Sequence, residues 1–445
     1  MPGQAITAND TSRAPSLALY LCLLIAVGVV PLLLDPSNLG NTYYAAKARA
    51  LYLLTPVTLL AFGVHARTNR NTDPLPLVAV GYFLVVSAVA TALAVNPAWS
   101  LRGSPWRSEG LGAYLGYAAV FLSALTAGRS GYAARWQAVV IACGAVVAAY
   151  GIAQYLGYEW LVRDSQRLDW FQAFSTSGNA NFLGAYMVLI FPLAVAAALI
   201  ARQSMAAGLW MGAAGALFLA ALCTYSRAAW AALAVEILLL GLWLPRLRPE
   251  VSRRRIIVLA LALAIVTIVF LVPGGPLAPR TSEVALASRA LSGLEYRSPG
   301  VQSRLYLWRE AASLVIRRPL FGYGPEAFPL IFPQGWDEER QRLFGEMPLT
   351  IDKAHNDTLD LAISIGLLGL LGFWGILGVS LHRALQVARR SGPQALLGAA
   401  LVAGLLAYWF DLQFQFSVVS VAPVFWSALG IAAGLPAARR DSYVT

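Results

Sequence analysis

The chain has 445 residues, of which 58% are apolar and 12% charged, whereas soluble proteins carry about a quarter of charged residues. This composition excludes an ordinary soluble domain and predicts an all-α polytopic membrane protein. The net charge of +11 does not indicate a nucleic-acid-binding tail, because acidic residues accompany the basic ones in the longest polar connection.

Twelve apolar runs are long enough to be transmembrane helices, since a helix needs about 20 apolar residues to cross a bilayer. They lie at about 17–34, 48–65, 75–95, 111–127, 136–157, 180–200, 207–225, 228–244, 256–272, 357–381, 394–411 and 415–435. We expect the first run to be a true span rather than a cleaved signal peptide, because a sixteen-residue segment with many polar residues precedes it and no cleavage site follows. Cys22, Cys143 and Cys223 lie inside such runs and are expected to be packing residues.

The distribution of basic residues predicts the orientation of the chain, because cytoplasmic loops are enriched in Lys and Arg. Sixteen of the 33 basic residues fall in segments that are cytoplasmic if both termini are inside, and seven in the short outer connections. The remaining ten lie in one long outer connection. Long loops are translocated regardless of their charge, so these ten do not count in the orientation. We therefore divide the chain into a nine-span region (1–272), a long extracytoplasmic loop (273–355) and a three-span region (356–445), with both termini in the cytoplasm.

The long loop begins at the Pro/Gly sequence 273–276, and its segment 301–317 has the apolar spacing of an amphipathic helix. Such a helix is typical of the membrane interface and would hold Arg304 and Arg309 near the lipid headgroups. Arg318 and Pro319 follow, then the turn Phe321–Pro325, which includes Tyr323. The N–H groups of this turn could approach a ligand, or the turn could simply end the helix.

His355 lies at the end of the loop, immediately before the next apolar run. Asn356 or Asp357 is a suitable N-cap for that helix. The positive end of the helix favours neutral imidazole whereas Asp352 favours the charged form, so the sequence leaves the direction of the pKa shift open. A neutral histidine here could accept a proton from a sugar hydroxyl. We expect His65 and His382 to lie on the inner side.

Two other outer junctions carry polar groups. Arg227 follows a very short turn between the seventh and eighth spans, and a cation so close to hydrocarbon needs an anionic partner. Asn179 and Asn181 open the sixth span, where a helix N-terminus favours anions or hydroxyls. Glu236, near the middle of the eighth span, is expected to be buried and paired.

In this order, these stretches resemble the bacterial O-antigen ligase and O-antigen polymerase superfamily. The matching pieces are Gly178–Asn181, Ser226–Arg227, Arg304–Trp308, Arg318–Gly324, His355–Asp357 and Gly366–Gly369. The resemblance covers about 175–380 and implies an inverting, metal-independent glycosyltransferase without a cofactor. It also implies that the protein lies in a bacterial inner membrane and that 273–355 is its catalytic loop. Its donor would be a glycan on undecaprenyl (polyprenyl) diphosphate in the membrane, and its acceptor a hydroxyl of a lipid A core.

The resemblance also implies residue roles. Arg227 and Arg304 would hold the diphosphate, and His355 would orient or deprotonate the acceptor. Further candidates for substrate binding are Arg309, Arg318, Tyr323, Asn356, Asp352, Asn179 and Asn181. Positioned guanidinium groups can offset the charge of a diphosphate leaving group, so no metal is required.

Alternative functions share some of these features. A polysaccharide polymerase or a protein O-oligosaccharyltransferase would use the same donor chemistry with a different acceptor. A transporter or flippase for a lipid-linked solute would place charged residues and broken helices near the bilayer centre in both halves of the chain, with repeat symmetry. Among the predicted spans only Glu236 is so placed and no repeat is visible, so we favour the enzyme. A non-catalytic scaffold would leave the outer arginines and His355 unexplained.

Overall fold

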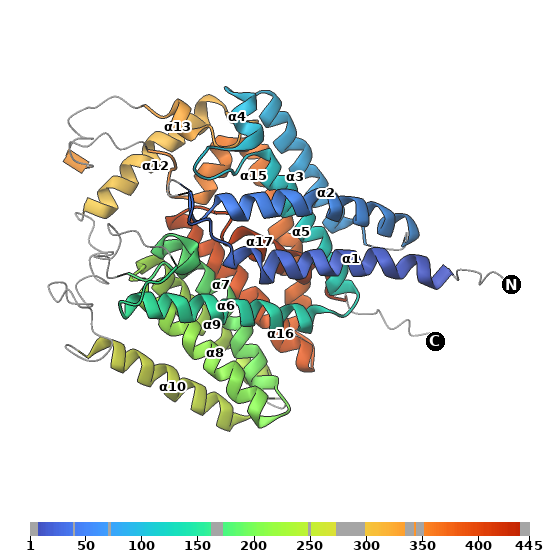
Figure 1. Ribbon diagram of the computed structural model, residues 1–445, viewed down its shortest axis with the longest axis vertical. Coiled ribbons are helices and arrows are strands. Elements are labelled where there is room, and N and C mark those ends of the chain that lie inside the picture. Colours follow the sequence, from blue (N-terminus) through green and yellow to red (C-terminus); the bar gives the residue numbers. More distant parts are fainter. Residues whose placement is uncertain are drawn as a thin grey trace.

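The protein is a polytopic all-α membrane protein (Figure 1). The computed structural model describes residues 8–38, 41–69, 73–161, 172–247, 251–272, 299–333, 342–343 and 351–436. The Pro/Gly sequence 273–276 and most of 334–350 in the predicted loop lie outside these ranges. Among the described residues every regular element is helical.

Each of the twelve predicted apolar runs contains a described helix. These helices are α1 (Ala8–Gly28), α2 (Ala45–Thr68), α3 (Leu75–Ala92), α5 (Leu111–Arg129), α6 (Ala133–Tyr155), α7 (Ala180–Ile200), α8 (Ser204–Cys223), α9 (Arg227–Leu247), α10 (Arg253–Leu271), α15 (Asp357–Ala388), α16 (Pro393–Asp411) and α17 (Ala422–Gly434). In the described ranges, ten helical segments are long and apolar enough to cross a membrane. The other two helices are α9, with 21 residues, and α17, with 13.

Small residues allow the central helices to approach closely, as in other membrane bundles. A Cβ atom added at Gly430 of α17 would lie 2.4 Å from the Phe121 carbonyl oxygen of α5, and one at Gly434 would lie 2.4 Å from the Leu125 carbonyl oxygen. The apolar helix α7 is buried on almost every side, whereas α10 is mostly exposed at the periphery. The three cysteines are buried free thiols, in agreement with a packing role.

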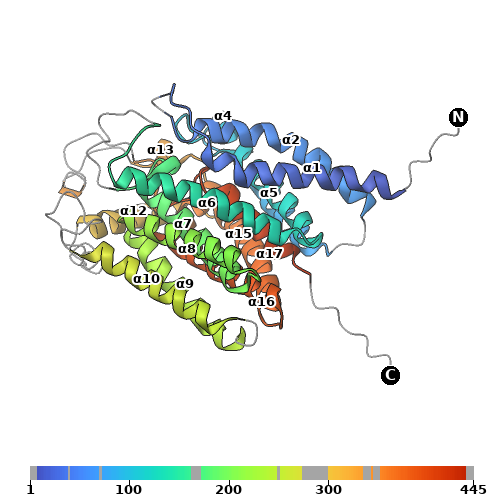
Figure 2. The same cartoon turned by 60° about the horizontal axis from the view of Figure 1, so that its bottom comes forward.

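The first and last spans reach the same end of the bundle. Tyr20 of α1 stacks on Tyr132 just after α5, with ring centroids 4.7 Å apart. The end of α17 packs beside the end of α5, where a Cβ atom at Gly128 would lie 3.1 Å from Gly434. This arrangement agrees with an even number of crossings. The amphipathic helix α12 (Pro299–Arg317) lies at the opposite end in both views (Figures 1 and 2).

Helix α15 is broken at Gly366, and the segment 319–324 fills the break. Gly366 has φ 71° and ψ 177°, values that no helix interior adopts. The carbonyl groups of Ile363 and Ser364 would normally accept from the N–H groups of residues 367 and 368. Instead they accept from the N–H groups of Tyr323 (2.8 Å) and Gly324 (2.9 Å).

The two N–H groups released by the break also bind this segment. Leu367 N–H donates to the Pro319 carbonyl oxygen (2.7 Å) and Leu368 N–H to that of Leu320 (3.4 Å). Four hydrogen bonds therefore replace the two that Gly366 removes, as the low-dielectric environment requires. The N–H groups of Tyr323 and Gly324 are consequently occupied, and the interpretation of this turn as a ligand-binding backbone is wrong for them.

The last span is shorter than the predicted run 415–435. Helix α17 begins at Ala422, and its 13 residues rise only about 20 Å, less than the roughly 30 Å of a bilayer core. The stretch before it consists of the 3₁₀ turn η4 (Leu412–Phe414) and the irregular residues 415–421, which are largely buried. Irregular backbone at membrane depth is tolerated where protein covers it or where it lines a cavity.

The docking of segment 319–324 leads to a prediction about Gly322. Gly322 has φ +66°, and an added Cβ atom would lie 2.2 Å from the Ile363 carbonyl oxygen. A left-handed conformation alone costs a non-glycine residue about 1–2 kcal/mol, and the backbone contact adds to this cost. We expect Gly322→Ala to lower the thermal unfolding midpoint in detergent by several degrees.

The matched control for this substitution is Gly375→Ala in the same helix α15. A Cβ atom at Gly375 meets nothing within 4 Å, and alanine has the higher helix propensity. We therefore expect an unchanged or slightly higher midpoint for the control. Equal midpoints for the two variants would contradict the docking.

Candidate functional site

Two arginines from different elements line one cavity of about 530 Å³. Arg227 is the first residue of α9, and Arg304 lies in the second turn of α12. The cavity is lined by Asn181, Tyr225, Ser226, Arg227, Ala228, Ala231, Val301, Arg304, Leu305, Trp308, Phe410, Phe414 and Gln415. We call it the arginine cavity.

The two guanidinium groups are close enough to interact electrostatically. Burial, together with the neighbouring Arg227, lowers the pKa of Arg304 from its ordinary value, while Asp411 opposes this shift. Arg227 also lies under the start of α12, because a Cβ atom added at Gly300 would be 3.3 Å from Arg227 Nη2. Two neighbouring cations in a partly apolar cavity create a strong preference for an anionic ligand.

The backbone before Arg227 makes a sharp turn that carries this side chain to the cavity. Tyr225 has φ 54°, and Ser226 Oγ accepts from the Ala229 N–H at 3.5 Å as α9 begins. Positive φ is uncommon for residues other than glycine and frequently occurs at functional sites. Tyr225 is held by its hydroxyl contact with Tyr155 (3.2 Å).

His355 lines a second cavity of about 230 Å³. The other lining residues are Tyr44, Trp106, Arg107, Asn179, Asn181, Phe182, Gln415 and Phe416. We call it the histidine cavity. Asn181 and Gln415 belong to the walls of both cavities, so the two cavities adjoin.

The histidine is held in an unusual conformation at the start of α15. Its φ is 53°, and its ring centroid lies 5.3 Å from that of Phe416. Asn356 is the N-cap of α15, because its Oδ1 accepts from the Leu359 N–H (3.1 Å). Asp357, the other cap candidate, is the first residue of the helix.

Burial settles the direction of the His355 pKa shift that the sequence left open. Desolvation lowers the pKa to about 4; the Asp352 carboxylate opposes this change, while nearby cations such as Arg304 and Arg107 add to it. The imidazole is therefore neutral near pH 7, so one ring nitrogen can accept a hydrogen bond from a hydroxyl group.

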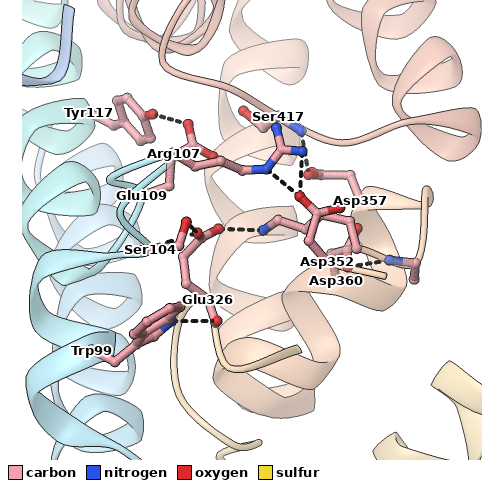
Figure 3. A network of polar contacts seen from close by, with 12 residues as sticks. Trp99, Ser104, Arg107, Glu109, Tyr117, Glu326, Asp352, Asp357, Asp360 and Ser417 are labelled. Atoms are coloured by element: carbon pink, nitrogen blue, oxygen red, sulfur yellow. Dashed lines mark hydrogen bonds and ion pairs between the residues drawn. The ribbon is translucent and has the colours of Figure 1, made fainter. Parts of the chain in front are cut away.

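Arg107 is part of the histidine cavity, although the sequence did not single it out. Its Nε and Nη2 donate to Asp352 Oδ2 at 2.9 and 2.6 Å (Figure 3). Its guanidinium also lies over the Phe416 ring, 4.4 Å from the centroid. Asp352 thus orients a paired cation beside the neutral His355.

A buried ion pair holds the segment before His355 against the loop that carries Arg107. Lys353 Nζ lies 2.8 Å from Glu326 Oε1, and Glu326 Oε2 accepts a hydrogen bond from Ser104 (Figure 3). Burial opposes both charges, but the pairing prevails: the pKa of Glu326 is lowered and that of Lys353 is raised. Trp99 Nε1 donates to the Glu326 carbonyl oxygen (2.9 Å), which fixes the same contact.

The start of α15 also positions the irregular stretch before α17. Asn356 Nδ2 donates to the Gln413 carbonyl oxygen (3.1 Å), and Asp357 Oδ1 accepts from the Ser417 N–H (3.0 Å). Gln415 and Phe416 lie between these two clamps, facing the cavities. The helix that follows His355 therefore holds both the histidine and the wall opposite it.

The other predicted residues fall into two groups. Asn179 is the N-cap of α7, with Oδ1 2.8 Å from the Asn181 nitrogen, and both residues line the histidine cavity. In contrast, Arg309, Arg318 and Tyr323 line neither cavity. Arg309 is exposed beside Glu310, and Arg318 stacks on Tyr323, whose hydroxyl donates to the Leu314 carbonyl oxygen (3.2 Å).

Glu236 is fully buried, as expected, but the expected partner is absent within the described part of the chain. Neither of its carboxylate oxygens has a hydrogen bond there, and the same holds for Asp411, with which it interacts electrostatically. Glu236 therefore lies beside another acid and not beside a base. Across the described ranges, no three His, Cys, Asp or Glu side chains converge as metal ligands would.

A comparison with known protein families matches much of the second half of the chain. Residues 211–374 match the family model described as O-Antigen ligase. The matched range includes Arg227, Arg304, His355 and the break at Gly366, and it supports the resemblance to the O-antigen ligase and polymerase superfamily. A comparison with curated proteins finds no match.

The lowered pKa of His355 predicts a contribution to the pH dependence of stability. Between pH 4 and 6.5 the unfolded chain binds a proton at this residue that the folded protein does not, so the neutral imidazole favours folding above pH 6.5 and this advantage is lost as the pH falls toward 4. We expect the unfolding midpoint to fall more steeply between pH 7.5 and 4.5 in the wild type than in His355→Asn, which tolerates positive φ.

Measurement of thermal unfolding at both pH values in the same detergent would test this expectation. Carboxylates contribute equally to the two proteins and cancel in the comparison. His382→Asn, a substitution in the half of α15 that is distant from His355, serves as the control and should follow the wild type. An equal fall in the wild type and in His355→Asn would show that the imidazole is not neutral in the folded state at pH 4.5.

Proposed function

From the O-antigen ligase family match and the two adjoining cavities, we propose that this protein is a glycosyltransferase of the O-antigen ligase type. It transfers a glycan from a polyprenyl diphosphate to the hydroxyl group of an acceptor. The observation that carries the proposal is that Arg227 and Arg304 line one cavity while His355 lines the next, with Asn181 and Gln415 between them.

The arginine cavity suits the diphosphate of the donor. Guanidinium groups form bidentate, charge-assisted hydrogen bonds with phosphate oxygens. Burial and the neighbouring Arg227 both lower the pKa of Arg304, so a phosphate group near Arg304 would favour its charged form. As the bond from the sugar to the diphosphate breaks, negative charge grows on the leaving oxygen, and the two cations stabilise it in the transition state.

His355 suits the role of general base. The neutral imidazole accepts the proton of the acceptor hydroxyl, whose oxygen attacks the anomeric carbon from the side opposite the diphosphate. One C–O bond forms as the other breaks, so the anomeric configuration inverts and polyprenyl diphosphate leaves. The proton then passes from the imidazolium to water. Arg107, which Asp352 holds in place beside this histidine, would contact the acceptor in the histidine cavity.

The polyprenyl chain would enter the arginine cavity on its apolar side. Its apolar lining includes Leu305 and Trp308 of α12, Phe410 of α16 and Phe414 of η4. A lipid tail between α9, α12 and α16 would leave its headgroup beside the arginines. This assignment gives the amphipathic helix a role in donor binding at the membrane interface.

We propose a lipid A core as the acceptor, as the O-antigen ligase match suggests. We also propose that the cavities face the extracytoplasmic side, because the basic residues of the sequence favour cytoplasmic termini. A polymerase or a protein O-oligosaccharyltransferase would use the same arginines and histidine. Incubation of purified protein with polyprenyl-diphosphate glycan and, in separate reactions, a lipid A core, a second glycan or a pilin-type peptide distinguishes the three by product mass.

Transport is disfavoured by where the helix breaks occur. Inverted repeats would place matching discontinuous helices in both halves. The break at Gly366 and the irregular residues 412–421 both lie in the C-terminal part, and the spans described before residue 273 contain no comparable internal break. Moreover, the break at Gly366 is filled by protein backbone.

Substitutions at the two cavities test the catalytic roles. We expect Arg227→Lys and Arg304→Lys each to lower transfer by roughly 10²- to 10³-fold, because lysine keeps the charge but not the bidentate geometry. We expect a similar or larger loss for His355→Asn. Initial rates with purified, folded variants provide the measurement.

Arg102→Ala is the matched control for these variants. Arg102 is an exposed arginine at the end of α4 (Pro97–Arg102) and belongs to neither cavity. This control should transfer at the wild-type rate. Full activity of any one of the three site variants would remove the role proposed for that residue.

Metal independence has a separate test. If guanidinium groups supply the charge stabilisation, turnover should continue at an unchanged rate in excess EDTA. The measurement is product formation before and after chelation, with added Mg²⁺ as a second arm. Complete loss that Mg²⁺ restores would contradict the proposed mechanism.

A further inference from the structure

Gln415 is a buried amide at the junction of the two cavities with no hydrogen bond to either of its polar atoms in the described part of the chain. Its residue is 2% exposed, and Nε2 and Oε1 both lack partners there. An amide buried without partners is costly and calls for an explanation, such as a ligand that completes it.

The surroundings hold Gln415 in place without satisfying it. The preceding residue, Phe414, packs near Trp308 in the arginine cavity, with ring centroids 6.3 Å apart. The following residue, Phe416, packs against His355 in the histidine cavity. Gln415 thus lies between the groups proposed for the diphosphate and for the acceptor.

The nearby Gln413 provides a comparison, because its side-chain amide is hydrogen-bonded within the protein at both ends. Gln413 donates from Nε2 to the Trp409 carbonyl oxygen (2.9 Å) and accepts at Oε1 from the Thr358 hydroxyl (2.8 Å). Both ends of Gln413 are occupied by protein, whereas both ends of Gln415 are available. The contrast indicates that Gln415 serves a ligand and not the fold.

We propose that Gln415 is a positioning residue that hydrogen-bonds the first sugar of the donor, at the substituent on the carbon next to the anomeric centre. This inference rests on the proposed function. The reacting carbon must lie between diphosphate and acceptor, which places its neighbouring substituent beside Gln415. An amide both donates and accepts, so it matches a hydroxyl or an acetamido group.

Such a contact aligns the anomeric carbon for attack. Hydrogen bonds to the 2-substituent of a sugar strengthen in transition states with positive charge on the ring. A site built to hydrogen-bond a polar group also discriminates strongly against a substrate that lacks it, because its own buried polar atoms then stay unpaired. Gln415 would therefore determine selectivity for the first sugar.

The test compares donors and variants together. Wild type, Gln415→Leu and Gln413→Leu are assayed with three synthetic undecaprenyl-diphosphate donors that carry N-acetylglucosamine, glucose or 2-deoxyglucose, with a lipid A core as the acceptor. We expect the wild type to use at least one of the two substituted donors about tenfold or more better than the 2-deoxy donor, as kcat/KM. We expect Gln415→Leu to lose this preference.

Stability provides the readout that separates positioning from a structural role. Gln415→Leu removes a buried amide without partners, so its unfolding midpoint should be unchanged or higher. Gln413→Leu breaks two hydrogen bonds, so its midpoint should fall while it keeps the wild-type preference among donors. A lower midpoint for Gln415→Leu with equal losses on all three donors would overturn the inference.

Failure of this inference is distinguishable from failure of the proposed function. If the wild type transfers sugar from these donors and Gln415→Leu keeps the same preference, the inference alone is wrong. If the wild type transfers from none of the three donors, to the lipid A core or to water, the proposed function fails and the inference fails with it.

Discussion

The docking of segment 319–324 into the break of α15 is the contact on which the arrangement of the site depends. It replaces two helical hydrogen bonds with four others, and so keeps the backbone satisfied where water is scarce. The same segment follows α12 directly, so it sets where Arg304 lies. It also adjoins the first turns of α15, which begin two residues after His355. One backbone contact therefore couples the positions of the cation and the base.

Electrostatics in the site follow from this placement. Arg304 and Arg227 come from elements far apart in sequence and line one cavity, where burial and the neighbouring Arg227 disfavour the charge of Arg304. On the other side, burial holds His355 neutral while Arg107 and Asp352 neutralise each other. An anion is thus favoured in one cavity and a neutral hydroxyl in the next. Displacement of a diphosphate by a hydroxyl requires an anion-binding cavity next to a cavity that accepts a neutral group, and the two cavities have this arrangement.

Backbone irregularity concentrates at the same end of the bundle. Tyr225 and His355 have positive φ, α15 is broken, and residues 412–421 interrupt the last two spans. Regular helices satisfy their own backbone and leave few polar groups for a ligand, whereas irregular segments can direct side chains inward. Gln415 and Phe416 face the cavities because they lie in such a segment, held at both sides by Asn356 and Asp357.

The amino-acid sequence by itself determined the spans, because a bilayer demands long apolar runs. It drew attention to Arg227 and His355, which lie at the ends of spans, and the family resemblance added Arg304 and the roles of all three. The sequence also predicted α12 from its periodicity. Only the tertiary structure decided that N–H groups of the Phe321–Pro325 turn are hydrogen-bonded to carbonyl groups of α15. It also decided that Arg309 and Arg318 lie away from the cavities, whereas Arg107 and Gln415 belong to their walls. The physical reason is that a membrane span depends on the hydropathy of consecutive residues, which the sequence shows directly. The role of a polar side chain depends on contacts with residues that are distant in sequence. In the sequence, Gln415 is only the first residue of a predicted span. In the structure, its buried amide lies at the junction of two cavities without a hydrogen-bond partner in the described part of the chain.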